Sequence, residues 1–231
     1  MSGEPTGDSG PLRTLARQIR KAFVSPEEIL PFLLGKLRVR RVIHDGQSYF
    51  RYRGKLYPAH LNGGNGQSQI RDRALAYCRG KGIDVGASQW PFPGADPIQQ
   101  GRKRNALRLE DVPESSLDFV FSSHCLEHIV PWREALAVWI SKLKEGGVLF
   151  LYLPHEDMEL WHPGGPWAGP SHKWIPTWQM LVPFLESQGM EPIDVERGRD
   201  AFWSFHVAAR RAGKKASSVE TVEASTPASD V

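Results

Sequence analysis

Short apolar runs alternate with segments of helical periodicity through the middle of the chain. An apolar run of four to eight residues between turn signals predicts a buried strand, and apolar residues at every third or fourth position predict a helix. Strands are expected at 82–85, 95–98, 105–107, 117–122, 147–153, 192–197 and 201–210, and helices at 68–79, 132–143 and 177–187. This alternation predicts an α/β fold with a doubly wound, mostly parallel sheet.

The N-terminal part follows a different pattern. Ser25, Pro26 and Glu28 form a helix-start signal, and leucines follow at helical spacing. Three short β-type runs come next, separated by Asp45-Gly46 and Gly54, which are turn residues. We therefore expect a small basic helix and hairpin extension at 25–66, the main domain at 67–211, and disordered ends at 1–24 and 212–231.

Composition places the chain among ordinary globular proteins, with 40% hydrophobic and 24% charged residues. No apolar run approaches the ~20 residues of a membrane span, and the first residues lack the apolar centre of a secretory signal. Cys78 and Cys125 have no metal-binding or redox spacing. We expect a cytoplasmic protein with reduced thiols.

Charge is unevenly distributed along the chain. Residues 1–80 carry 14 Lys or Arg and 6 Asp or Glu, whereas residues 81–231 carry 15 and 20. The basic excess is densest at Lys36, Arg38, Arg40, Arg41, Arg51, Arg53 and Lys55. A solvated basic face explains this pattern, and so does a surface for a phosphorylated substrate, an anionic lipid leaflet or nucleic acid.

Three motifs stand out in order: KGIDVGAS from Lys81, LDFVFSSHCLEHI from Leu117 and LKEGGVLFLYLP from Leu143. Together they resemble the first, fourth and fifth strands of class I, Rossmann-like S-adenosylmethionine-dependent methyltransferases, of the Methyltransferase-11-like kind. The resemblance covers about residues 70–211. It implies a Rossmann-like sheet closed by an antiparallel hairpin, with S-adenosylmethionine as the cofactor.

The same resemblance implies the cofactor-binding residues. Asp84 matches the acidic residue that faces the methionine ammonium, although a buried Asp capping its own turn is the alternative. Gly86, Ala87 and Ser88 match the small-residue turn that lets the backbone approach the ligand. Asp96 matches the acid that accepts both ribose hydroxyls.

This chain departs from the family pattern in two places. The segment QWPFPG contains two prolines and cannot form the first crossover helix, so Trp90 and Phe92 either pack over the cofactor or plug the sheet. Arg108 falls at the usual acidic slot for the adenine. Glu110 or Asp111 can substitute there, or both are solvated loop acids.

The end of the fourth strand carries Ser123, His124, Glu127 and His128. The resemblance places this sequence beside the sulfonium, with Ser123 and His124 in contact with the methionine part of the cofactor and Glu127 and His128 orienting the loop. We expect no metal site, because the two histidines have no clear third ligand with zinc spacing.

Methyl transfer to a hydroxyl benefits from a base, and His155 and His172 are the two candidates. His172 lies in the aromatic, glycine-rich segment WHPGGPWAGPSHKW, which we expect to form a lid facing the substrate, although its tryptophans can also pack as core. The LEHI, LYLPH and HKW motifs resemble small bacterial enzymes of glycan and surface-polysaccharide biosynthesis.

The leading hypothesis is therefore an O-methyltransferase acting on a small-molecule or lipid-linked saccharide acceptor, with the basic region holding a phosphorylated part. Peripheral membrane contact stays open, and nucleic acid is disfavoured because no RNA-binding module is recognisable. An RNA or protein methyltransferase and a non-catalytic cofactor-binding partner subunit are the alternatives. A nicotinamide dehydrogenase is disfavoured because G-x-G-x-x-G is missing.

Overall fold

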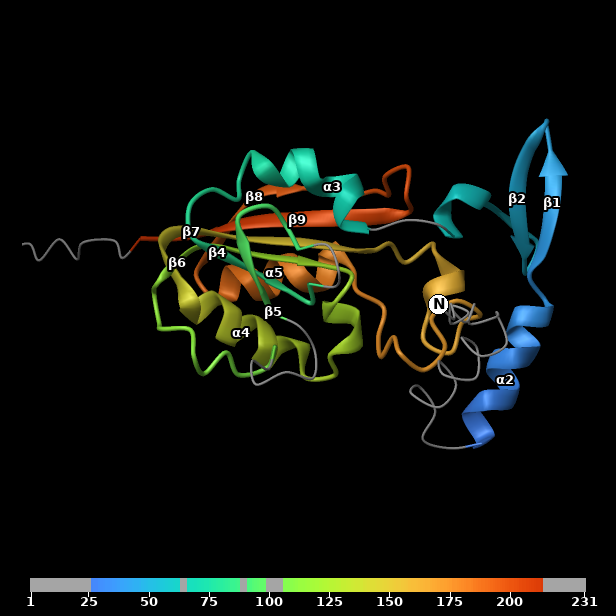
Figure 1. The fold of residues 1–231 in the computed structure, drawn as a ribbon, viewed down its shortest axis with the longest axis horizontal. Coiled ribbons are helices and arrows are strands. Elements are labelled where there is room, and N and C mark those ends of the chain that lie inside the picture. Colours follow the sequence, from blue (N-terminus) through green and yellow to red (C-terminus); the bar gives the residue numbers. More distant parts are fainter. Residues whose placement is uncertain (1–25, 63–65, 88–90, 99–105, 214–231) are drawn as a thin grey trace, which may run out of the picture.

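The computed structural model describes residues 26–62, 66–87, 91–98 and 106–213, which form a large sheet domain and a smaller N-terminal extension (Figure 1). The ends expected to be disordered, 1–24 and 212–231, lie outside these ranges except for residues 212 and 213. Ser88 and Trp90 also lie outside them. Within the described ranges, no helix combines the length and apolar character needed to cross a bilayer.

In the described part of the chain, six strands form the central sheet, in the order β5-β4-β6-β7-β9-β8. β5, β4, β6 and β7 are parallel, and β9 runs antiparallel between β7 and β8. The mostly parallel sheet with a closing antiparallel hairpin is confirmed. The strands are β4 (Gly82–Val85), β5 (Ala95–Ile98), β6 (Leu117–Ser123), β7 (Leu143–Pro154), β8 (Met190–Val195) and β9 (Ser204–Arg211).

Helices cover both faces of this sheet, with α3 on one face and α4 and α5 on the other (Figure 1). Leu149 and Leu151 of β7 belong to the core cluster formed with α4 and α5, whereas Phe150 and Tyr152 belong to the cluster under α3. Burial on both faces explains why β7 is apolar from Val148 to Pro154. The helices are α3 (Gly66–Leu75), α4 (Trp132–Lys142) and α5 (Trp178–Ser187).

The prediction of a strand at 105–107 is wrong for the residues that the structure describes. Ala106 and Leu107 form a turn, and Asn105 lies outside the described ranges. The indole nitrogen of Trp139 donates a 2.6 Å hydrogen bond to the carbonyl of Ala106. The backbone is thus held by a side chain of α4, and Leu107 packs against the core. The helix expected at 68–79 ends early, at Leu75, and continues in turns.

The extension consists of α2 (Pro26–Leu37), β1 (Arg40–His44), β2 (Gln47–Tyr52), β3 (Lys55–Pro58) and the short 3-10 helix η1 (Ala59–Asn62). Its three strands form an antiparallel sheet joined by two-residue loops, Asp45-Gly46 and Arg53-Gly54. All four loop residues have positive φ, as type I′ turns require.

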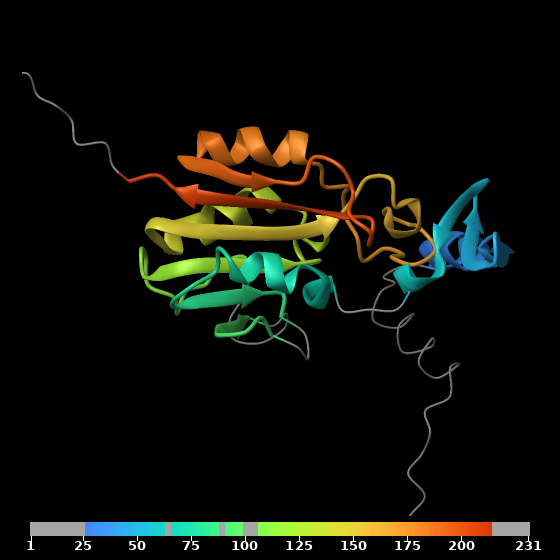
Figure 2. The ribbon, with the colours of Figure 1, turned by 90° about the horizontal axis from the view of Figure 1, so that it is seen from above.

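A third core cluster joins the extension to the sheet domain. Tyr52, Tyr57 and Leu61 of the extension pack with Met158 and Leu160, which follow β7 in the chain. The extension consequently lies beyond the carboxyl ends of the parallel strands, as Figures 1 and 2 both show. In an open α/β sheet this is the end at which ligands bind.

Candidate active site

The turn after β4 holds the first group of predicted cofactor residues. Asp84 is 3% exposed, and its carboxylate accepts a 2.8 Å hydrogen bond from the backbone N–H of Phe92. Burial raises the pKa of Asp84 to about 6, although this hydrogen bond acts in the opposite direction. Ala87 is also buried. The predicted contacts of these residues with the cofactor stay predictions.

Gly86 has a packing reason to be glycine. Its φ is +90°, a conformation that side chains disfavour, and a Cβ there would overlap the side chain of Cys125. The turn after β4 therefore lies directly against the loop after β6. The two loops that the sequence assigned to the cofactor are adjacent in space.

Phe92 packs into the core at the end of the sheet rather than over the cofactor site, and this decides between the two alternatives that the sequence left open for it. It is 1% exposed and stacks on Phe121, with ring centroids 4.3 Å apart. Such a contact belongs to the apolar core under α3, and no surface of this ring is left for a ligand.

The predicted partners of the ribose and adenine are all exposed. Asp96 lies inside β5, paired with Ile83, two residues before the strand ends at Ile98. Glu110 and Asp111 lie in a turn. The Glu110 carboxylate is 3.4 Å from the guanidinium of Arg108, so the cation at the adenine slot has an acidic neighbour. Roles in cofactor binding stay predictions for these three acids.

A cavity of about 240 Å³ opens between the carboxyl end of the sheet and the extension. Its walls come from η1, the start of α3, the end of β7, the segments that follow β6 and β7, and the start of β9. Among them are His124, Tyr152, Trp161, His172, Phe202 and Ser204. The cavity walls thus combine aromatic surfaces with hydrogen-bonding groups.

The two candidate bases, His155 and His172, differ in their position relative to the cavity. His172 lines the cavity, with 10% of its side chain exposed. His155 is not among the lining residues of this cavity; its ring lies edge-on to Phe205. The Nδ1 of His155 accepts a 3.1 Å hydrogen bond from the N–H of Asp157, so a neutral ring carries its proton on Nε2.

Glu127 forms the centre of a histidine cluster that the sequence did not predict. Its side chain is fully buried, and its Oε1 lies 3.6 Å from His124 Nδ1 and 3.8 Å from the Nε2 atoms of both His128 and His172. Burial raises the pKa of Glu127 to about 8. Burial, together with neighbouring histidines, lowers the pKa of His172 to about 3 and that of His124 to about 4, so both rings are neutral at physiological pH.

The geometry adds a third candidate ligand that the sequence did not connect with the two histidines. Ligand atoms of Glu127, His128 and His172 all lie within 4.8 Å of one another. The missing residue was His172, which comes from the predicted lid, far from the LEHI motif in sequence. In the sequence, the motif itself showed only an acid, Glu127, between two histidines shortly after an apolar strand.

The three tryptophans of the predicted lid have different positions. Trp161 lines the cavity. Trp167 lies edge-on to Phe50 of the extension, with ring centroids 5.2 Å apart. Trp174 stacks on Trp132 at 4.9 Å and its indole donates to the carbonyl of Leu126. The segment is therefore partly cavity wall and partly core.

Comparisons with known proteins agree with this architecture. The family model for a methyltransferase domain matches residues 68–196. No curated protein matches the chain. Among solved structures, a SAM-dependent methyltransferase from Archaeoglobus fulgidus is similar, with 18% identity and a TM-score of 0.51, over 62% of this chain and 92% of that one.

An S-adenosylmethionine-dependent methyltransferase from Mesorhizobium loti has 14% identity and a TM-score of 0.51, over 65% of this chain and all of that one. These structures share the fold. The family match covers more than half of the chain and includes the strands and loops that build the ligand-binding edge. The chain belongs to the methyltransferase-domain family and is an S-adenosylmethionine-dependent methyltransferase.

Proposed function

We propose that this methyltransferase transfers the methyl group to a hydroxyl of a saccharide acceptor, either a small molecule or a lipid-linked one. The observation that carries the proposal is the cavity beside the carboxyl ends of β6 and β7. Trp161 and Phe202 offer aromatic surfaces, and Gln69 and His172 offer hydrogen-bonding groups. Sugar rings need both, since their C–H faces stack and their hydroxyls hydrogen-bond.

The size of the cavity supports a small acceptor unit. Its volume of about 240 Å³ lies below the roughly 300–1,000 Å³ of sites for drug-sized ligands. One sugar unit of a larger acceptor suits this space better than a folded macromolecule does. The rest of such an acceptor would extend over the neighbouring surface of the extension.

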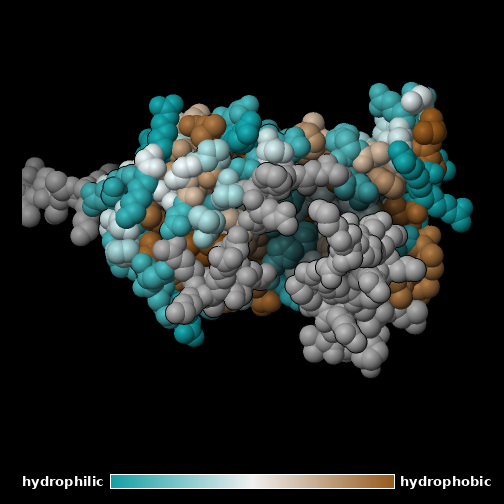
Figure 3. Space-filling model, viewed as in Figure 1, coloured by the Kyte–Doolittle hydropathy of each residue, from teal (hydrophilic) through white to brown (hydrophobic). Residues whose placement is uncertain are grey.

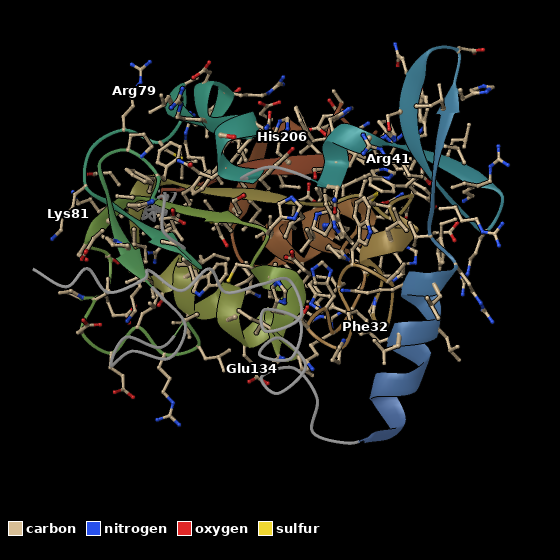
Figure 4. The ribbon with its side chains drawn as sticks, turned by 45° about the vertical axis from the view of Figure 1, so that its right-hand side comes forward. Phe32, Arg41, Arg79, Lys81, Glu134 and His206 are labelled. Atoms are coloured by element: carbon tan, nitrogen blue, oxygen red, sulfur yellow. The ribbon has the colours of Figure 1, made fainter. Side chains whose placement is uncertain are left out.

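The extension offers charge for a phosphorylated part of the acceptor. Arg38, Arg40 and Arg51 are exposed, and guanidinium groups bind phosphate in a bidentate manner. Arg41, labelled in Figure 4 at the hairpin, donates a 2.7 Å hydrogen bond to Ser48. Lys55 has a different role, because it pairs with Glu159 at 2.6 Å and ties the extension to the segment after β7.

Exposed hydrophobic side chains next to these cations support a lipid-linked acceptor. Leu37 is 75% exposed and Ile43 is 71% exposed. Figure 3 shows hydrophobic surface at this end of the molecule, over α2 and β1. Apolar residues flanked by cations suit the surface of an anionic leaflet.

The experiment incubates the protein with S-adenosylmethionine and a panel of sugar phosphates, sugar nucleotides, lipid-linked saccharides and RNA. Release of S-adenosylhomocysteine identifies the acceptor, and mass spectrometry with NMR locates the methyl group. We expect O-methylation of a saccharide. Methylation of RNA or protein, or cofactor binding without turnover on any acceptor class, would reject the proposal.

A pair of variants then tests the cavity. Trp161→Ala should raise the acceptor KM by about tenfold, which corresponds to about 1.4 kcal/mol of lost stacking, and leave cofactor affinity unchanged. Trp178→Ala is the matched control, because Trp178 lies on α5 and packs under Arg197, outside this cavity. Equal effects of both substitutions would show that the Trp161 effect is a general loss of stability.

A further inference from the structure

Glu127 is buried without compensation for its carboxylate. Its side chain is 0% exposed, and neither Oε1 nor Oε2 has a hydrogen-bond partner in the part of the chain that the structure describes. An unpaired carboxylate in an apolar interior is costly, and natural proteins keep one where a cation or a ligand meets it. A buried carboxyl group whose two oxygens lack partners is costly in either protonation state, so Glu127 offers unused ligand atoms at this place.

Two of the neighbouring histidines present an unprotonated nitrogen to Glu127. The Nδ1 of His128 donates to the carbonyl of Ser171 at 2.9 Å, so the Nε2 of a neutral ring keeps its lone pair. The Nε2 of His124 lies 3.2 Å from the hydroxyl of Ser204, which itself donates to the carbonyl of Phe202. His124 is consequently the donor to Ser204, and its Nδ1 lone pair faces Glu127.

His172, which comes from the predicted lid, completes the group, and its ring centroid lies 4.6 Å from that of His128. Its Nε2 lies 3.8 Å from Glu127 Oε1, and the backbone of Trp161 hydrogen-bonds the ring. An outer hydrogen bond that orients an imidazole is typical of metal-binding histidines. Both His128 and His172 have such a bond.

The distances fit ligands around a shared ion. Separations of 3.6–3.8 Å between Oε1 and the three ring nitrogens exceed the ~3.2 Å limit for a hydrogen bond, so a shared proton does not bridge them. Zinc lies about 2.0–2.2 Å from nitrogen and oxygen ligands, and a tetrahedral arrangement then separates the ligands by about 3.4 Å. The ligand atoms of Glu127, His128 and His172 lie within 4.8 Å of one another, so side-chain movements would bring them to this spacing around an ion.

We propose that Glu127, His128 and His172 bind a divalent transition-metal ion of the Zn²⁺ type. Two imidazoles and a carboxylate suit such an ion, whereas Mg²⁺ and Ca²⁺ prefer oxygen ligands. Three protein ligands leave a coordination position for water or an acceptor oxygen. Because His172 also lines the cavity, that position is accessible to a bound acceptor.

The role of the metal site in the reaction rests on the proposed function. The binding of the metal does not. An ion at this place would orient an acceptor hydroxyl and make its proton easier to lose, which strengthens the oxygen as a nucleophile. Binding of the metal itself requires neither the cofactor nor the acceptor. A failed search for an acceptor therefore leaves the test of metal binding intact.

The experiment uses the full chain without a histidine tag, stripped of metal with a chelator and then dialysed. Co²⁺ is titrated while its visible absorption is recorded, and Zn²⁺ binding is measured by calorimetry. We expect one ion per chain, with Zn²⁺ displacing Co²⁺. Glu127→Gln and His172→Ala should each weaken binding by about 100-fold or more, beyond the loss typical of an outer partner.

Two controls separate this site from surface histidines. His155→Ala and His44→Ala should leave the affinity within about twofold, because His155 lies against Phe205 and His44 is exposed on the hairpin. The Gln side chain has nearly the same shape as Glu, so Glu127→Gln remains informative if His172→Ala does not fold. The proposal is overturned if the folded native protein binds neither ion, or if Glu127→Gln binds as tightly as the native protein.

Discussion

Two aspartates of the central sheet lie in opposite environments. Asp194 on β8 accepts two 2.7 Å hydrogen bonds from the guanidinium of Arg73 and lies 3.1 Å from His206, which Figure 4 labels. These partners hold the pKa of Asp194 well below its usual range. Asp84 on β4 is buried and accepts its hydrogen bond from the neutral backbone amide of Phe92, and burial raises its pKa to about 6.

The difference separates a carboxylate that is paired with a cation from one whose described hydrogen bond comes from a neutral backbone amide. The Arg73–Asp194 pair fastens α3 to the edge of the sheet. The backbone N–H of Phe92 compensates the charge of Asp84 less than Arg73 compensates that of Asp194, so ionisation of Asp84 remains costly. A cationic ammonium group is the ligand that the family resemblance assigns to Asp84, and the burial of this carboxylate gives that assignment a physical reason.

The largest contrast is expected in the pH dependence of stability. The pKa of Asp84 is higher in the folded than in the unfolded chain, so its contribution to stability falls as the pH rises from about 4 to about 6, by about 1.4 kcal/mol per pH unit at most. Asp194 contributes in the opposite direction: its stabilisation is present above its ordinary pKa and is lost as the pH falls below it. Urea unfolding between pH 3 and 8 measures both.

Asp84→Asn should remove the decline between pH 4 and 6 relative to the native protein, and Asp194→Asn should reduce the loss at low pH. The expected difference between the two aspartates would be contradicted if the free energy of unfolding depended on pH in the same way in the native protein and in both variants.

Asp84→Asn should also weaken S-adenosylmethionine binding by about 10- to 100-fold, the loss of one charge-assisted contact. The amide keeps an oxygen to accept the hydrogen bond from Phe92, so the turn is expected to fold normally. Calorimetry at pH 7.5 measures the affinity, and thermal melting checks the fold. Native affinity in a folded Asp84→Asn variant would remove Asp84 from the cofactor site.

Asp194→Asn should lower the free energy of unfolding at pH 7 by about 1–2 kcal/mol. The Asp194 side chain is 10% exposed, but Arg73 is 54% exposed, and solvent reduces the value of the pair accordingly. Cofactor affinity should stay within about twofold of the native value. A large loss of cofactor affinity would mean that the two regions are coupled.

The smallest effect is expected for Gly66→Ala at the start of α3. A Cβ there would lie 2.7 Å from the ring of His124 and 3.2 Å from the hydroxyl of Ser123, so His124 must shift. Helix propensity favours alanine and offsets the crowding, which leaves stability within about 1 kcal/mol. Cofactor affinity should fall a few-fold, measured against Gly198→Ala, whose Cβ would meet only ordinary contacts. Unchanged affinity would place Ser123 and His124 away from the cofactor.

The sequence predicted the sheet well where burial alone decides the pattern. β4, the middle of β6 and the second half of β7 are buried runs, and the expected order of helices and strands follows from them. The prediction of a strand at 105–107 was wrong because the carbonyl of Ala106 accepts a hydrogen bond from the indole of Trp139. No local sequence pattern encodes this long-range contact. The Gly86 turn was predicted from its small residues, but its packing against Cys125 was not.

The histidine cluster was beyond prediction for a related reason. Glu127 and His128 come from one motif and His172 from a distant, irregular segment, so only the folded chain brings them together. Asp194 and Arg73 likewise lie far apart in sequence. Local periodicity reveals strands and helices, whereas pairs of charged side chains depend on how these elements pack.

The most direct test of the cofactor site is the number of protons released when S-adenosylmethionine binds. If the cofactor ammonium meets Asp84, binding lowers the pKa of Asp84 from about 6. Calorimetry at pH 5.5 in buffers of different ionisation enthalpy should then show release of most of one proton, with affinity rising from pH 5 to 7, and Asp84→Asn should abolish both effects. Binding without proton release and with constant affinity across this range would contradict the account.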